Sequence, residues 1–130
     1  EPKYWKTTGC VCQLPYYLNA IAEMNKRISQ PSYYVFSDDI AWVKENLPLP
    51  KAFFIDWNKG TESWQDMMLM SRCRHHIICN STFSWWGAWL NPRENKTVIM
   101  PERWFRHCET PDICPDKWIK VPINQPDSIQ

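Results

Sequence analysis

Apolar residues along this 130-residue chain alternate between a helical and an extended spacing. Within residues 14–28, the side chains of Tyr17, Ile21, Met24 and Ile28 recur every three or four positions and share one helical face. Elsewhere the chain carries short uninterrupted apolar runs, such as YYVF and AFFI, which are typical of strands buried on both faces. The pattern therefore predicts helices and strands in alternation.

The predicted helices cover residues 14–28, 39–46, 61–73 and 81–90, and the predicted strands cover residues 33–36, 52–55, 75–79, 97–100 and 118–121. Strands that alternate with helices indicate βαβ units, and therefore a parallel sheet with helices on both faces. The predicted fold is thus α/β and Rossmann-like, in a single domain that spans residues 1–130.

Two of these helices carry large apolar side chains. The buried stripe of the helix at residues 61–73 is expected to consist of Trp64, Met67, Met68 and Ser71. In the helix at residues 81–90, one face carries Trp85, Trp86 and Trp89, and Gly87 permits the close approach of a neighbour. We expect most of this indole surface to pack and to fix the preceding loop, with Trp85 or Trp86 reaching the site.

Composition narrows the function only slightly. Nine tryptophans and an aromatic content of 15% suit a sugar-handling protein, but equally a small domain that needs bulk in its core. The net charge is +1 without a long basic run, so the electrostatic footprint of a nucleic-acid binder is missing. No apolar run approaches the roughly 18 residues of a membrane span.

The cysteines leave two alternatives open. They are Cys10, Cys12, Cys73, Cys79, Cys108 and Cys114. An even number can indicate disulfides, and a Cys108–Cys114 pair would bracket a loop. The run CRHHIIC at residues 73–79 raises a zinc site, but its spacing fits no common zinc framework. A strand at these residues is favoured, with His75 and His76 on opposite faces.

Ligands of an open parallel sheet bind beyond the carboxyl ends of its strands, which selects residues 37–39, 56–60 and 80–84. The loop at residues 80–84 runs into the start of a helix, where free amides and the helix dipole favour an anion such as phosphate. Hydroxyl donors there are Ser81, Thr82 and Ser84. The alternative is that Ser81 only caps its helix.

The loop at residues 37–39 has a different chemistry. A carboxylate there can accept paired hydrogen bonds from the N1–H and N2–H₂ groups of guanine. Alternatively, Ser37 or Asp38 caps the helix that begins at Asp39, and both roles can coexist with one carboxylate each. The chain has no glycine-rich phosphate loop.

A resemblance to a known family is carried by YVFSDDIAWV at residues 34–43, DWNKG at 56–60, DMMLMSRCRH at 66–75 and NSTFSWWGAWLN at 80–91. In this order, the runs resemble the C-terminal half of the α-1,2-fucosyltransferases of glycosyltransferase family 11, in its bacterial branch. The run VIMP and the following Trp104-Phe105 continue the likeness, which extends from about Cys10 to Val121.

The resemblance implies the C-terminal nucleotide-sugar domain of a two-domain, GT-B-like enzyme. Such an enzyme transfers L-fucose from GDP-fucose to the 2-hydroxyl of a galactose-terminated glycan with inversion, without a metal or other cofactor. It is expected to be cytoplasmic, or peripherally attached to a membrane. The residues implied in nucleotide recognition are Ser37, Asp38 and Asp39. Those implied in contact with the diphosphate and fucose are Asn80, Ser81, Thr82, Phe83 and Ser84.

One departure from the family is the absence of its first motif, His-x-Arg-Arg-Gly-Asp. The paired arginines of that motif would neutralise the diphosphate leaving group, and preorganised charge of this kind is usually the largest catalytic term. We therefore expect a fragment that lacks the N-terminal acceptor domain and that binds GDP or GDP-fucose with little transfer. No catalytic base is assigned.

A missing strand upstream would also leave a sheet edge unpaired, so we expect self-association into a homodimer through that edge. Two other classes stay open. The chain could be a non-catalytic module that binds a nucleotide or glycan, or a small extracellular domain stapled by disulfides.

Overall fold

The structure is a computed structural model that describes residues 12–37, 39–49, 51–55, 60–104 and 113–124. In chain order, its elements are α2 (Leu14–Arg27), β1 (Tyr33–Phe36), α3 (Ile40–Asn46), β2 (Ala52–Ile55), the 3₁₀ turn η1 (Gly60–Glu62), α4 (Ser63–Arg72), β3 (His76–Ile77), α5 (Thr82–Trp89), β4 (Val98–Pro101) and β5 (Ile119–Val121). This order confirms the predicted alternation of helices and strands.

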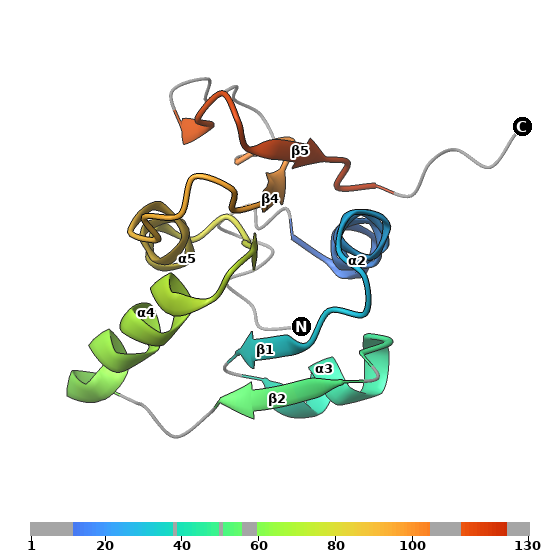
Figure 1. Cartoon of the computed structure of the whole chain (residues 1–130). Coiled ribbons are helices and arrows are strands. Elements are labelled where there is room, and N and C mark those ends of the chain that lie inside the picture. Colours follow the sequence, from blue (N-terminus) through green and yellow to red (C-terminus); the bar gives the residue numbers. More distant parts are fainter. Residues whose placement is uncertain (1–11, 38, 50, 56–59, 105–112, 125–130) are drawn as a thin grey trace, which may run out of the picture.

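The strands are parallel, as predicted, but they form two sheets within the described residues instead of one. β1 pairs with β2, in a register that places Tyr34 opposite Phe53. The second sheet has the order β3-β4-β5, with β4 in the centre. Figure 1 shows both sheets and the helices around them, and the Rossmann-like α/β class is confirmed.

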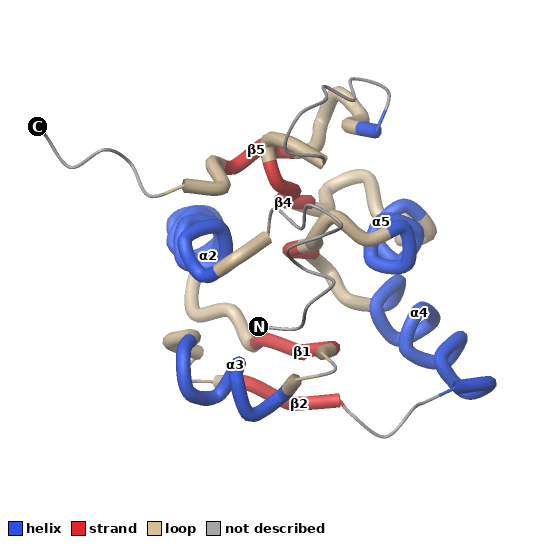
Figure 2. The backbone as a smooth tube through the Cα atoms, turned by 180° about the vertical axis from the view of Figure 1, so that it is seen from behind, coloured by secondary structure: helices blue, strands red, loops and turns tan. Residues whose placement is uncertain are grey.

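The three-stranded sheet is covered on both faces. Successive residues of a strand point to opposite faces, and β4 is buried along its whole length. Ile99 packs in one cluster with Tyr16, Ala20 and Met24 of α2. Val98 and Met100 point to the other face and pack in a second cluster with Ala88 of α5. Helices α2 and α5 accordingly lie on opposite sides of β4 in both views (Figures 1 and 2).

Helix α4 corrects one expectation. It buries no residue, and Trp64 and Met68 of the predicted stripe are 56% and 40% exposed. The helix packs against α5 through a close contact, because a Cβ added at Gly87 would lie 2.9 Å from the Cβ of Met70. Residue periodicity identified the helix correctly, but the side on which it packs is set by α5.

The β1–β2 sheet is less well covered. Tyr34 and Phe53 are 53% and 55% exposed, and their rings stack at 5.0 Å. On the helix side, the ammonium of Lys44 lies 5.0 Å from the ring centroid of Phe54. The expectation of helices on both faces therefore holds for the three-stranded sheet but not for this exposed pair. Across the described chain, no helix has the length and apolar character of a membrane span.

Candidate functional site

Residues 78–81 connect β3 to α5 at the carboxyl edge of the three-stranded sheet (Figure 1), so the predicted loop at residues 80–84 comprises the end of this connection and the first turn of α5. Ser81 has an extended backbone and caps α5, since its Oγ accepts a hydrogen bond from the Ser84 amide at 3.4 Å. The Ser81 carbonyl accepts from the Trp85 amide at 3.0 Å. The predicted capping role of Ser81 is therefore present in the structure.

Two further side chains of this loop bind backbone carbonyls. The Ser84 hydroxyl lies 3.2 Å from the Cys79 carbonyl oxygen and 3.0 Å from that of Ser81. The side-chain amide nitrogen of Asn80, Nδ2, donates to the Trp104 carbonyl oxygen at 3.2 Å. These bonds hold the backbone on both sides of the cap, so the loop enters the helix in a defined geometry.

Thr82 and Phe83 occupy the first two positions of α5, where backbone amides have no acceptor inside the helix. The Thr82 side chain is exposed, and Phe83 is half-buried. These two amides, the Thr82 hydroxyl and the positive end of the helix dipole together favour an anionic group at this position.

Tyr16 of α2 contacts the backbone just before this loop, and its role did not follow from the sequence pattern. Its side chain is fully buried, and its hydroxyl donates to the carbonyl of Ile78, the residue that follows β3. Burial raises the pKa of Tyr16 well above its ordinary value, so the hydroxyl keeps its proton and acts as a donor. The available signal was the helical spacing of Tyr16, Ala20 and Met24.

The loop at residues 37–39 follows β1. The Ser37 hydroxyl oxygen accepts from the Asp39 amide at 3.0 Å, and Asp39 Oδ1 accepts from the Trp42 amide at 3.0 Å. Asp39 itself thus caps α3, which corrects the expectation that Ser37 or Asp38 is the cap. Asp38 lies outside the described residues. Asp39 is exposed, and its second carboxylate oxygen is not used by the cap.

The structure places the two predicted groups of site residues after strands of different sheets, since β1 pairs with β2 and β3 with β4. Residues 56–59 of the third predicted loop lie outside the described residues. The nucleotide role of residues 37–39 and the diphosphate role of residues 80–84 stay predictions.

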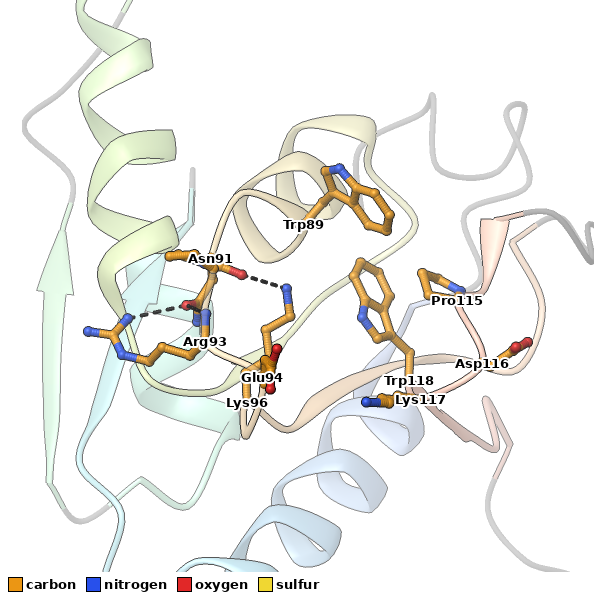
Figure 3. Close-up of a pocket in the computed structure, with 10 residues that line it drawn as sticks. Trp89, Asn91, Arg93, Glu94, Lys96, Pro115, Asp116, Lys117 and Trp118 are labelled. Atoms are coloured by element: carbon orange, nitrogen blue, oxygen red, sulfur yellow. Dashed lines mark hydrogen bonds between the residues drawn. The ribbon is translucent and has the colours of Figure 1, made fainter.

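A pocket of about 400 Å³ opens at the opposite, amino edge of the three-stranded sheet (Figure 3). It is lined by Trp89, Asn91, Pro92, Arg93, Glu94, Lys96, Pro115, Asp116, Lys117 and Trp118. These segments precede β4 and β5 or end α5, which places the pocket away from the loop at residues 80–84. The Lys96 ammonium donates to the Ala88 and Asn91 carbonyls at 2.9 and 2.7 Å and so caps the end of α5.

A buried polar network lies beside this pocket. The side-chain nitrogen Nδ2 of Asn91 is 2.7 Å from the Cys73 carbonyl oxygen and 2.9 Å from His76 Nε2. Burial, and secondarily the Lys96 ammonium, lower the pKa of His76 from 6.5 to about 4. His76 is therefore neutral at pH 7, and its Nε2 accepts the hydrogen bond from Asn91.

The neighbouring imidazole is also engaged, because His75 Nδ1 accepts from the Thr97 amide at 3.0 Å. No group of three metal-ligating side chains occurs within the described ranges, so the side chains of residues 73–79 are not placed together as a zinc site would require.

The predicted disulfide concerns Cys108 and Cys114. Cys114 carries a free thiol, whose Sγ lies 3.5 Å from the Pro115 carbonyl oxygen. Cys108, its expected partner, lies outside the described residues.

The tryptophans of α5 divide into two groups. Trp85 packs as predicted: it stacks on Trp89 at 5.2 Å, lies 5.6 Å from Trp118 and donates to the Ile113 carbonyl at 2.8 Å. Trp86 and Trp89 are 47% and 49% exposed. The expectation that most of the indole surface packs is therefore wrong for these two residues.

Comparison with known proteins finds glycosyltransferases among the relatives of this chain. The chain is 37% identical over 115 residues to an Escherichia coli α-1,2-colitosyltransferase, covering 85% of this chain and 40% of that protein. It is 38% identical over 112 residues to the Escherichia coli O-antigen biosynthesis glycosyltransferase WbnK, covering 85% and 37%. It is also 31% identical over 91 residues to galactoside α-(1,2)-fucosyltransferase 1 of Saimiri boliviensis boliviensis, covering 68% and 24%.

The chain thus spans two fifths or less of the length of these relatives. No solved structure matches it. The family described as Glycosyl transferase family 11 matches residues 1–121. On the strength of this match over nearly its whole length, the chain belongs to glycosyltransferase family 11.

Proposed function

We propose that this chain is the donor-binding part of an inverting α-1,2-glycosyltransferase, with GDP-fucose as its donor and a galactose-terminated glycan as the acceptor. The family match supports the reaction class, and the names of the relatives indicate fucosyl or colitosyl transfer with α-1,2 linkage. The observation that carries the proposal is the start of α5 beyond β3, where Thr82 is exposed and the first two amides have no acceptor inside the helix.

In this proposal the diphosphate binds at the start of α5, through the Thr82 hydroxyl and the first helical amides. The guanine base is recognised by a carboxylate of residues 37–39, for which the second oxygen of Asp39 is available. Neither metal nor other cofactor takes part. The diphosphate is thus bound only by hydrogen bonds and by the positive end of the α5 helix dipole.

Transfer by these 130 residues is expected to be slow. The sequence contains no Arg-Arg pair, so the cations that would stabilise charge on the departing diphosphate are missing from it. Donor binding and transfer are therefore separable properties of this chain, and we expect the first without much of the second.

Calorimetry with GDP, GDP-fucose, GDP-colitose and a free galactoside tests the proposal, in the presence of EDTA. We expect heat from the nucleotides in EDTA and about tenfold weaker GDP binding in Thr82→Ala, which is the loss of one hydrogen bond to a charged group. Thr97→Ala removes a threonine hydroxyl at the amino edge of the same sheet and serves as the matched control. Equal losses in both variants, or no nucleotide heat, would contradict the proposal.

The second candidate is a non-catalytic module that binds glycan. The half-exposed indoles of Trp86 and Trp89 favour it, because flat aromatic faces stack on sugar rings. Heat from the free galactoside without nucleotide, lost in Trp86→Ala, would support this alternative over a donor site.

A further inference from the structure

The hydrogen-bond ladder between β3 and β4 stops where β4 reaches a proline. His76 pairs with Val98 and Ile77 with Ile99, and the Ile78 amide donates to the Ile99 carbonyl at 2.9 Å. In a parallel ladder, the next bond runs from the amide of residue 101 to the carbonyl of Ile78. Residue 101 is Pro101, which has no N–H, so β4 cannot supply this donor.

Tyr16 supplies the donor that Pro101 lacks. Its hydroxyl reaches across from α2 and donates to the Ile78 carbonyl, and it lies 3.4 Å from the Ile99 carbonyl. Ile78 is 3% exposed and Tyr16 is fully buried, so water does not replace this bond freely. A buried carbonyl without a donor costs about as much as a lost hydrogen bond.

Ile78 directly follows β3, and its amide still bonds to β4 just before the loop at residues 80–84. The next carbonyl, that of Cys79, is within 3.2 Å of the Ser84 hydroxyl, and Asn80 binds the Trp104 carbonyl. The direction in which the chain leaves the sheet is therefore set at Ile78, one residue before these loop contacts begin.

From this arrangement we infer that Tyr16 is a positioning residue for the donor-binding loop. Its hydroxyl replaces the missing Pro101 amide, orients the peptide after Ile78 and so aims the start of α5 at the diphosphate. The inference rests on the proposed function for its ligand, but the geometry of Tyr16, Ile78 and Pro101 does not depend on it.

The test compares Tyr16→Phe, Pro101→Ala and the double variant with the wild-type chain. Tyr16→Phe keeps the ring and removes the hydroxyl, and Pro101→Ala restores an amide in register with the Ile78 carbonyl. The matched control is Tyr33→Phe, which removes a tyrosine hydroxyl bonded to Asn25 Oδ1 at 2.7 Å, outside this loop. GDP affinity is measured by calorimetry, and backbone hydrogen exchange is measured at residues 80–84, both well below the melting temperature.

We expect Tyr16→Phe to weaken GDP binding about tenfold and to accelerate exchange at residues 80–84, and Tyr33→Phe to do neither. The double variant is expected to recover most of both losses, because the new amide donates where the hydroxyl did. A purely structural role would lower the melting temperature but leave GDP affinity and exchange at residues 80–84 as they are in Tyr33→Phe, and unchanged exchange in Tyr16→Phe would overturn the inference. If the wild-type chain binds no GDP, the proposed function fails, and hydrogen exchange with its rescue still decides the role of Tyr16.

Discussion

The two sheets have strands of similar apolar character but very different burial. The strands YYVF and AFFI of β1 and β2 leave Tyr34 and Phe53 more than half exposed, whereas VIMP of β4 is buried at every position. The difference lies in what covers them, because β4 is flanked by two strands and lies between α2 and α5. A two-stranded sheet is marginally stable by itself. The free energy of unfolding should therefore depend mainly on the three-stranded sheet.

The largest expected effect is a truncation in the centre of that sheet. Ile99→Ala removes a side chain that is 0% exposed, and it should lower the free energy of unfolding by about 4 kcal/mol. Phe53→Ala removes a larger side chain from the exposed sheet and should cost less than about 1 kcal/mol. Urea denaturation measures both values. Similar losses would show that the two sheets contribute equally.

Acidification should act on the three-stranded sheet through His76. Its pKa is about 4 in the folded chain and 6.5 ordinarily, so between these values the unfolded chain binds a proton that the folded chain does not. Stability is therefore complete above pH 6.5, falls by up to about 3 kcal/mol as the pH approaches 4, and falls no further from this group below 4. Denaturation at several pH values should give a flatter profile for His76→Gln than for wild type. Parallel profiles would remove His76 as the cause.

The attachment of α4 to this region depends on the absence of a side chain at Gly87. Gly87→Ala should stabilise the isolated helix by about 1 kcal/mol, because alanine is the better helix former. However, its Cβ would lie 2.9 Å from the Cβ of Met70. Because that Met70 atom is fixed to the backbone of α4, the helices must separate, and we expect a net loss of about 1 kcal/mol. Thermal unfolding measures it. A gain in stability would indicate that α4 shifts freely on α5.

The smallest effect on stability is expected at the exposed face of the β1–β2 sheet. Phe53→Lys should change the free energy of unfolding by less than about 0.5 kcal/mol and should reduce self-association, because β2 pairs with β1 alone in the described sheet and a lysine on an edge strand opposes pairing with another chain. Leu90→Lys changes a side chain of similar exposure, 52% against 55%, at the C-cap of α5 and is the matched control. Light scattering at high concentration measures the mass. A monomer at every concentration in the wild-type chain would refute self-association.

Local pattern was sufficient for the order of the elements and for the bounds of β1 and β2. It failed where a partner decides the outcome. The strand predicted at residues 75–79 is paired over His76–Ile77 alone, because its neighbour presents Pro101 next. Likewise, the apolar face of α4 stays exposed because α5 contacts a different side of the helix.

The candidate site was predictable in part, for a similar reason. Residues 37–39 and 80–84 were selected as candidate binding loops because each follows a strand and precedes a helix. The order of elements along the chain is enough to identify such loops. Contacts between distant residues did not follow from it. Tyr16 and Ile78 are 62 positions apart, and His76 and Asn91 are 15 apart, so their hydrogen bonds arise only when α2 and α5 pack on the sheet.

The substitution of a tyrosine hydroxyl for a proline amide also constrains how this sequence can vary. If Pro101 changes first, the chain gains an amide that can serve the Ile78 carbonyl, and the Tyr16 hydroxyl is then dispensable, so a change to phenylalanine, which keeps the buried ring, is tolerated. If Tyr16 changes first, that carbonyl loses its donor while the proline is still present. The same two substitutions are thus expected to be tolerated in one order and harmful in the other, so the accessible path between sequences has a direction.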